Sequence, residues 1–295
     1  MRYAPTAARP LRGKARRMAY HMDIQPHWHS WAQLVFSMSG AVRVSAFKER
    51  RAAPELLDQL EGWAAPLPGT LPGPGGADHD GPDSSYLVPP SRAVWIPPGV
   101  VHAVTAVEQA DLRTVYLHEN AVQQLAAGGD WSQCRVLDVT PLLRELVIQL
   151  ATAPDGEAVD KPDRAREQGI NTLILDELRR ARSVQLGLPL PREGRLRRVC
   201  DAMLDEPLRH ADIEGWAAEA ATSARTLSRW FTEELGTSYG QWRQQLLLAK
   251  ALTMAARKLP MNLIAAELGY ASPSAFSAMV TRAVGMPPSR FFAEA

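Results

Sequence analysis

The last third of the chain contains one helix-turn-helix pattern written twice, and this repeat limits the fold more than any other feature. Trp216-Ala-Ala-Glu219 begins the first copy and Ile264-Ala-Ala-Glu267 begins the second. Each copy continues through a short break into an amphipathic segment that ends at a glycine, Gly236 or Gly285. Because self-similarity of this length marks a repeated structural unit, the sequence predicts two helix-turn-helix units in tandem.

Both copies carry the same helix start signals and the same small residues. Ser223 and Ser272 are expected N-caps, and Pro273 takes the first helical position, where its missing N–H costs nothing. Ala217 and Ala265 fall where the second helix of each unit crosses the first, because only a short side chain permits that approach.

A long helix is predicted between the two units. The capping box Ser238-Tyr-Gly-Gln241 starts it, and Pro260 stops it after about Lys258. A generic helical bundle would use the same caps and the same periodicity, and it is the plain alternative to a DNA-binding domain.

The stretch from Leu196 to Phe292 resembles the DNA-binding domain of the AraC/XylS family of transcriptional regulators. Its closing pattern, Phe276 followed by Thr281-Arg-Ala-Val-Gly285-Met-Pro287, is similar to the family's C-terminal signature. Ala278 and Val280 depart from it, since family members often carry arginine and phenylalanine there. The resemblance implies a cytoplasmic homodimer that binds double-stranded DNA and, if it is an activator, RNA polymerase.

The residues expected to contact DNA lie on the second helix of each unit. Arg225 and Arg229 are four residues apart, so they share a helix face suited to reading base edges. The second unit has no early arginine, and Arg282 with nearby hydroxyls is expected to anchor phosphates. The candidates are Ala224, Arg225, Thr226, Ser228, Arg229, Ser274, Ser277, Thr281 and Arg282.

Length, charge and cysteine content limit which classes of protein the chain can belong to. A chain of 295 residues suits two domains of ordinary size, and no apolar run is long enough to cross a membrane. Because the net charge is only +1, DNA affinity must come from local placement of charge. Cys134 and Cys200 lie far apart without further cysteines, which disfavours zinc and disulfides and fits a reducing cytosol.

The N-terminal residues 1–17 are basic and contain no acid. No apolar segment of the secretory type follows them, so we expect a disordered basic tail. An arm that contacts DNA phosphates is the alternative.

Residues 18–120 have the pattern of a β-sandwich or barrel. Turn signals at Ser39-Gly40 and Pro97-Pro-Gly99 punctuate the strands. Residues 47–85 are expected to form a loop insertion, with a short helix over 54–63, a solvated His79, and either a lid function or none. The expected strands are Trp31 to Met38, Ala41 to Ala46, Tyr86 to Val88, Ala93 to Ile96, Ala103 to Val107, and Leu112 to Leu117.

Two short motifs in this domain resemble the cupin motifs. The first is His27-Trp-His29 with Gln33 and Gly40, and the second is Pro97-Pro-Gly99-Val-Val-His102. His27, His29 and Gln33 share parity, so on one extended strand they would point to the same face, where His102 could meet them.

Three roles are open for this cluster. Three imidazoles and an amide oxygen could hold a divalent transition metal, or contact an effector, or bond to each other and to the backbone. Gln33 replaces the acidic ligand of the usual cupin motif, and Ala106 replaces its late asparagine. AraC/XylS sensor domains often bind an organic effector without metal. Trp31 and Trp95 are therefore added to the histidines and Gln33 as candidate effector contacts.

Residues 121–185 are predicted to be helical. One apolar stripe runs from Leu142 through Leu146 to Leu150, and a second includes Leu173. These stripes could pack on the barrel, although the family resemblance implies dimerisation. Residues 186–192 are predicted to form a stiff extended linker before a DNA-binding domain at 193–295.

The expected architecture is thus an α+β multidomain chain with a cupin-like sensor, a helical dimerisation segment and an all-α tandem helix-turn-helix domain. The expected function is transcriptional regulation in response to a small molecule or metal, without enzymatic activity. A metal-dependent cupin enzyme, such as a dioxygenase or isomerase carrying a DNA-binding domain, is the alternative. An architectural DNA-binding protein without a ligand is a third interpretation.

Overall fold

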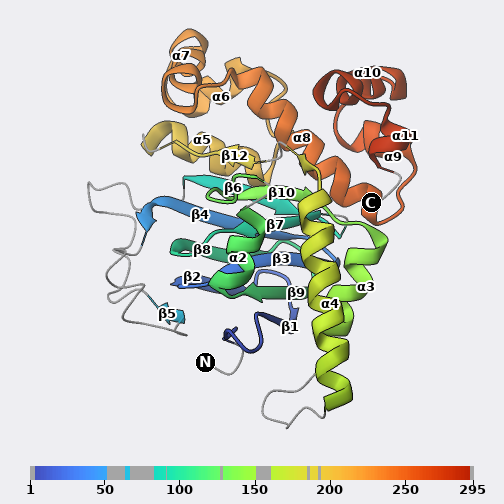
Figure 1. Ribbon diagram of the computed structural model, residues 1–295. Helices are drawn as coiled ribbons and strands as arrows, with labels where there is room; N and C mark the ends of the chain where they lie inside the picture. Colours follow the sequence, from blue (N-terminus) through green and yellow to red (C-terminus); the bar gives the residue numbers. More distant parts are fainter. Residues whose placement is uncertain are drawn as a thin grey trace. The chain divides into compact units, whose positions relative to one another are not determined.

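The structure is a computed structural model, and its cartoon is shown in Figure 1. It describes residues 4–51, 64–66, 83–90, 92–126, 129–150, 161–184, 187–191 and 194–292. The chain folds into two compact units, residues 1–68 with 88–185 and residues 69–87 with 186–295. None of the described helices is both long enough and apolar enough to cross a bilayer.

The first unit contains two antiparallel sheets. One has the strand order β1-β9-β3-β7-β10-β11, and four strands of the other have the order β4-β8-β2-β5. The strands are β1 Leu11–Met18, β2 Asp23–His29, β3 Ala32–Ser39, β4 Val42–Arg51, β5 Ala64–Pro66, β7 Arg92–Ile96, β8 Val100–Ala106, β9 Ala110–Leu117, β10 Arg135–Asp138 and β11 Ser183–Val184.

The six strands expected from the sequence are present with ends shifted by a few residues, but the expectation of a disordered tail is wrong in part. Leu11–Met18 forms β1, which pairs with β9 from Leu11↔Leu117 to Met18↔Ala110. Leu11 and Met18 are fully buried, and this burial anchors the strand. The basic residues on β1 therefore belong to the sheet.

Two glycine turns position the strands of the site. Gly40 has φ +69°, and a Cβ there would lie 2.1 Å from the carbonyl oxygen of Gln109, so only glycine fits this turn. Gly99 has φ +75°, and its N–H donates to the carbonyl oxygen of His29 at a distance of 2.9 Å. The second turn therefore joins the end of β2 to the start of β8.

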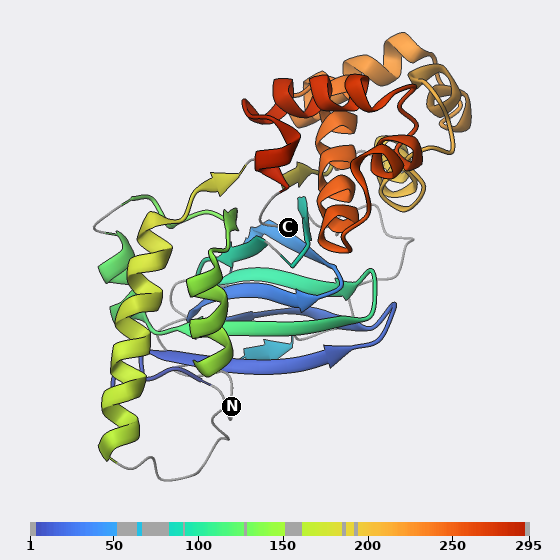
Figure 2. The same cartoon turned by 90° about the vertical axis from the view of Figure 1, so that its right-hand side faces the viewer.

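Three helices cover one face of the first sheet: α2 Glu119–Ala126, α3 Pro141–Leu150 and α4 Lys161–Arg180. Helices α3 and α4 run side by side (Figures 1 and 2). Their apolar stripes enter the same core as the sheet, so packing on the barrel accounts for most of both stripes. The buried residues of this core include Leu34, Phe36, Trp95, Leu143, Leu146, Val147, Leu150, Ile174 and Leu178.

Two leucines of these stripes are not in that core. Leu142 on α3 is 49% exposed and Leu173 on α4 is 46% exposed. Leu146, which we expected at a dimer interface, is only 8% exposed within its own chain. The segment also includes β10 and β11, so it is not wholly helical.

The second unit is mostly helical. It contains α5 Gly194–Asp205, α6 Ile213–Glu219, α7 Ala224–Leu235, α8 Tyr239–Ala256, α9 Met261–Glu267, α10 Pro273–Val284 and α11 Pro288–Phe291. Helices α6 and α7 form the first helix-turn-helix unit, α9 and α10 form the second, and α8 connects them (Figure 1).

The predicted caps of these helices are confirmed. The Oγ atoms of Ser223 and Ser272 accept backbone N–H groups from the first turns of α7 and α10, and Ser238 forms the capping box of α8. Gly236 and Gly285 have φ values of +64° and +72°, which end α7 and α10 in the left-handed conformation.

The expected linker is instead part of the second unit. Residues Gly187–Pro189 form β12, which pairs with β6 Ser84–Val88. Leu188 and Leu190 are buried in the core of the helical unit, and the indole N–H of Trp242 donates to the Pro189 carbonyl oxygen at 2.8 Å. A side-chain hydrogen bond and two buried leucines hold this segment in place.

Most of the expected loop insertion lies outside the described residues, including His79 and the helix expected over 54–63. Cys134 is half-buried and Cys200 is buried, and neither forms a disulfide.

Candidate sensor site and DNA-reading surface

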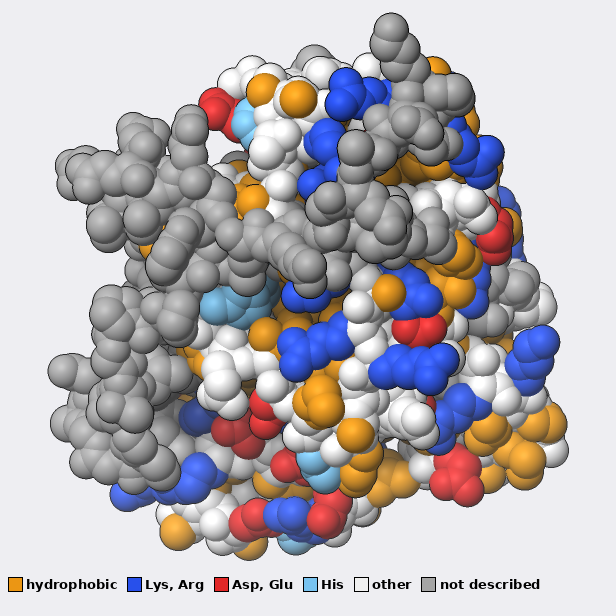
Figure 3. Space-filling model, turned by 90° about the horizontal axis from the view of Figure 1, so that it is seen from below, with side chains coloured by type: hydrophobic (Ala, Val, Ile, Leu, Met, Phe, Trp, Pro, Cys, Tyr) orange, Lys and Arg blue, Asp and Glu red, His pale blue; other side chains and the backbone are white. Residues whose placement is uncertain are grey.

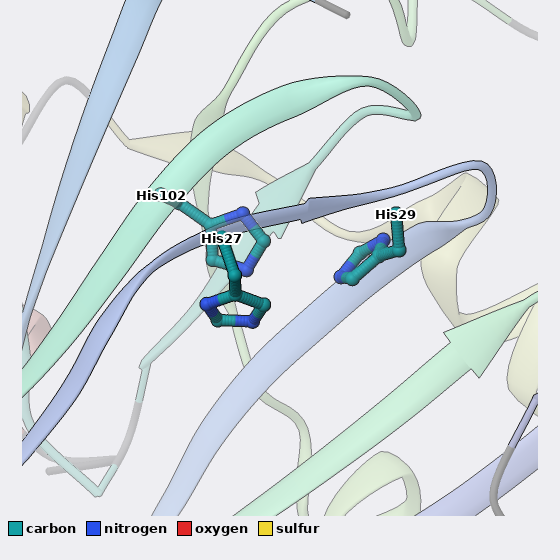
Figure 4. A group of neighbouring side chains, drawn as sticks. All are labelled: His27, His29 and His102. Carbon is teal, nitrogen blue, oxygen red and sulfur yellow. The ribbon is translucent and has the colours of Figure 1, made fainter. Parts of the chain in front are cut away.

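The three motif histidines gather between the strands of the first unit (Figure 4). His27 on β2 lies directly opposite His102 on β8, and their ring centroids are 4.3 Å apart. His29 ends β2, and its ring centroid is 5.1 Å from that of His102. One nitrogen from each ring lies within 4.8 Å of the corresponding atoms of the other two.

Backbone carbonyl groups set the tautomer of all three rings. Nδ1 of His27 lies 2.9 Å from the Gln25 carbonyl oxygen, Nδ1 of His29 lies 2.6 Å from that of Trp31, and Nδ1 of His102 lies 2.9 Å from that of Val100. A carbonyl oxygen can only accept, so each Nδ1 carries the proton and donates it. Each Nε2 is therefore left with its lone pair.

Burial keeps these rings neutral. It lowers the pKa of His29 to about 4, with a further contribution from neighbouring His27, and it lowers the pKa of His102 well below its ordinary value. The pKa of His27 is also lowered, again chiefly by burial. Because a metal binds the deprotonated nitrogen, neutral rings with free Nε2 lone pairs suit metal ligation.

Gln33 reaches this cluster from the facing sheet. The prediction that it shares one extended strand with His27 and His29 is wrong, because the chain turns at residues 30–31 and Gln33 lies on β3. Its Oε1 atom lies 2.6 Å from Nε2 of His29 and 2.9 Å from Nε2 of His102. The four side chains expected to converge do so, from both sheets.

The contact between Gln33 and the histidines is chemically informative. With every Nδ1 protonated, both Nε2 atoms and the Gln33 oxygen are acceptors facing one another. A cation bound between these acceptors would remove the repulsion between their lone pairs. A rotation of the Gln33 amide that turns its NH₂ group toward the rings would do the same. The donor set thus fits a divalent transition metal, with the three backbone hydrogen bonds orienting its imidazole ligands.

The two candidate tryptophans have different positions. Trp31 stacks on His29 with 5.1 Å between ring centroids and lies 5.9 Å from Tyr116, so it borders the cluster. Trp95 is fully buried in the core beneath α3 and α4, where its indole N–H donates to the Trp131 carbonyl oxygen. Trp95 faces away from the histidines, and its assignment as an effector contact is wrong.

A cavity of about 290 Å³ adjoins the cluster and includes His27 and Gln33 in its wall. Its basic side was not expected from the sequence, because Lys14 and Arg16 were assigned to the tail. Their alternation along β1 was the signal that could have revealed a strand. The other lining residues are Ile24, Gln25, Pro26, Val104, Leu112, Thr114 and Tyr116.

The side chains expected to read DNA are partly exposed on α7 and α10. Arg225, Ser228 and Arg229 are exposed on α7, whereas Ala224 and Thr226 are half-buried. Nε of Arg229 lies 3.7 Å from a carboxylate oxygen of Glu233 on the same helix.

On α10, Ser274, Thr281 and Arg282 are exposed, and Ser277 is half-buried. The Thr281 hydroxyl donates to the Ser277 carbonyl oxygen at 2.9 Å. Among the three arginines predicted to contact DNA, Arg225 and Arg282 are exposed, whereas Arg229 lies close to the carboxylate of Glu233.

Two family models match separate parts of the chain. Residues 73–178 match the AraC-like ligand binding domain, and residues 216–294 match a helix-turn-helix domain family. The HTH-type transcriptional regulator NimR of Escherichia coli is 32% identical over 208 residues, which cover 70% of this chain and 72% of NimR. The chain belongs to the AraC/XylS family of transcriptional regulators.

Further proteins are also similar to this regulator. The arabinose operon regulatory protein of Salmonella typhimurium is 29% identical over 154 residues, covering 51% of this chain and 53% of that protein. ToxT of Vibrio cholerae aligns with 97% of this chain and 98% of its own, with 10% identity and a TM-score of 0.35. The two matched family models give this AraC/XylS regulator a helix-turn-helix DNA-binding domain and a ligand-binding domain.

Proposed function

We propose that the ligand-binding domain of this regulator holds a divalent transition metal through His27, His29, His102 and Gln33. The observation that carries the proposal is the contact of each Nδ1 atom with a backbone carbonyl oxygen, since three Nδ1–H groups that donate to carbonyls would leave three Nε2 lone pairs for one ion. A bound ion would supply a positive centre for an effector and would tie β2, β8 and β3 together.

The metal content of protein purified from cells tests this proposal. Elemental analysis combined with native mass spectrometry should show about one ion per chain in the wild type. His102→Ala should lose it, whereas His118→Ala, in the same domain but outside the cluster, should retain it. If the wild type contained no metal and bound neither Zn²⁺ nor Co²⁺ after dialysis, the proposal would be wrong.

We further propose that α7 and α10 enter successive major grooves of double-stranded DNA. Arg225 and Arg229 would read bases, with Ser228 and the first-turn residues Ala224 and Thr226 close to the groove. Arg282, with the hydroxyls of α10, would hold phosphates. The regulator would act in the cytoplasm as a homodimer, with RNA polymerase as a partner if it activates transcription.

The proposed role excludes substrate turnover. A cupin enzyme uses its metal to transform a bound molecule, whereas a sensor releases the same molecule unchanged. Incubation of metal-loaded protein with an effector that it binds, followed by mass spectrometry of that effector, should therefore return it intact.

A further inference from the structure

A second pocket lies within the helical unit, between α8 and α10, and has a volume of about 310 Å³. One face of each helix lines it, because the contributing residues recur at helical spacing. Its lining includes Gly240, Arg243 and Gln244 from α8, Tyr270 after α9, and Ala275 and Arg282 from α10. No carboxylate lines it in the described part of the chain, so the pocket is basic.

The packing of the two helices fixes the walls of this pocket. The side-chain amide N–H of Gln244 donates to the backbone carbonyl oxygen of Met279 at 3.3 Å. Leu247 on α8 and Met279 on α10 also line the pocket, and both are buried. The pocket is therefore part of the helix packing of this domain.

Arg243 brings a buried hydrogen-bond donor to the pocket. The residue is half-buried, and its Nε atom is buried without a hydrogen-bond partner among the described residues. Its positive charge also opposes the rise that burial causes in the pKa of the neighbouring Tyr270 hydroxyl. Because a buried donor without an acceptor is destabilising, an anion that reached Arg243 would be favourably bound.

The first turn of α8 adds to the positive potential of the pocket. Gly240 is the second residue of this helix of 18 residues. Helix N-termini carry partial positive charge, which favours an anion nearby. A Cβ on Gly240 would have no atom within 4 Å, so the backbone is open to approach there.

The place of the pocket on α10 indicates where the anion comes from. Arg282 follows Thr281, which belongs to the face predicted to contact DNA, and it shares a face with Ala275 in the pocket. Phosphates border the groove that a recognition helix enters. The volume equals that of roughly ten water molecules in the liquid, which admits one phosphate group with part of its hydration.

We propose that this pocket binds one phosphate group of the DNA backbone, held by Arg243 from α8 and Arg282 from α10. The inference rests on the proposed function, because it requires α10 to lie in a major groove. It extends that function by assigning a DNA contact to the connecting helix. This contact would fix the second helix-turn-helix unit on the duplex.

A loss of affinity alone would not locate the contact, because Lys and Arg side chains also stand among hydrophobic ones on the face shown in Figure 3. The full chain is therefore titrated with a duplex that it selects from random DNA, with single phosphates replaced in turn by uncharged methylphosphonates. One replacement that weakens binding of the wild type should have no effect on Arg243→Ala or on Arg282→Ala. Arg243→Ala should bind the unmodified duplex about tenfold more weakly.

Arg195→Ala is the matched control, since it removes an exposed arginine from α5, outside the pocket. It should keep the wild-type pattern of methylphosphonate effects. The inference fails if Arg243→Ala responds at every position to which the wild type responds. It also fails if Arg195→Ala loses the same position as Arg243→Ala.

Substitution of Gly240 tests the pocket while both arginines remain. Gly240→Glu brings a carboxylate to the pocket, and an acidic residue in the first turn of a helix favours folding. It should bind DNA at least about tenfold more weakly than Gly240→Gln, which has nearly the same size without the charge. Equal DNA affinities of these two variants would overturn the inference.

Inorganic phosphate and pyrophosphate test a free anion as the other source of the same chemistry. In calorimetric titrations of the full chain, neither anion should show binding that Arg243→Ala abolishes. Pyrophosphate binding that depends on Arg243, combined with an unchanged methylphosphonate pattern in Arg243→Ala, would assign the pocket to a free anion and reject the inference.

Base selection separates this inference from the proposed function. If Arg225→Ala relaxes base selection while Arg243→Ala keeps the wild-type methylphosphonate pattern, the proposed function holds and the inference fails. If Arg243→Ala loses one position while Arg225→Ala selects the same bases as the wild type, the phosphate contact holds and the proposed base reading fails.

Discussion

Nε2 of His102 lies 2.9 Å from Oε1 of Gln33, although the two residues belong to strands of facing sheets and are 69 positions apart in the chain. Both atoms are acceptors when Nδ1 of His102 donates to the Val100 carbonyl oxygen at 2.9 Å. The site is thus suited to bind a cation, or else the Gln33 amide is rotated so that its NH₂ group donates to the rings.

The stability of the metal-free protein should fall as the pH falls from 6.5 to 4. The pKa of His29 is about 4 in the folded chain and 6.5 when unperturbed, so between these values only the unfolded state gains the proton. That difference removes on the order of 3 kcal/mol from the free energy of unfolding. Urea denaturation in EDTA at pH 7 and pH 4.5 measures it, and His29→Gln should show a distinctly smaller loss than the wild type.

Leu173→Asp should disrupt dimerisation without unfolding the chain, because Leu173 is 46% exposed on α4. Leu142→Asp on α3 should behave in the same way. Leu146→Asp is the contrasting variant, since it places a charge in the core of its own domain and should cost several kcal/mol of stability. Sedimentation velocity and circular dichroism distinguish the two outcomes. If both exposed variants remained folded dimers, the dimer interface would have to lie elsewhere on the chain.

Ser223→Ala and Ser272→Ala should each reduce stability by about 1 kcal/mol, because each removes a cap whose Oγ accepts a backbone N–H at 3.1 Å. Ser289→Ala, on α11, provides a surface control without such a cap bond in the described structure. Thermal melting of the full chain compares the three. A loss in Ser289→Ala as large as that in the cap variants would contradict the role given to the caps.

Arg225→Ala should relax base selection at one or two positions, because an arginine that pairs with a guanine contributes about 1–3 kcal/mol of discrimination. Arg229→Ala should have a smaller effect, because the nearby carboxylate of Glu233 partly compensates the positive charge of Arg229. Arg282→Ala should instead weaken binding to all sequences and reduce the salt dependence by about one phosphate contact. Selection from random DNA at fixed salt measures these effects. Altered base preferences in Arg282→Ala alone would reverse the assigned roles.

Local sequence signals predicted the helical domain well. N-caps at Ser223 and Ser272, the capping box at Ser238 and the glycines that end α7 and α10 all act over four residues or fewer. Such signals are complete within one short segment, so they could be read from the chain before the packing was known.

The sequence by itself also determined which residues form the histidine cluster, because the spacing of His27 and His29 and the glycine turn before His102 are local features. Only the tertiary structure decided how they meet. It showed that Gln33 comes from the facing sheet, that Trp95 faces the helices, and that Lys14 and Arg16 form a wall of the cavity. The physical reason is that strand pairing and register are set by non-local burial. The pairing of β1 with β9, more than 90 positions away at every register pair, turns an apparent basic tail into part of the site.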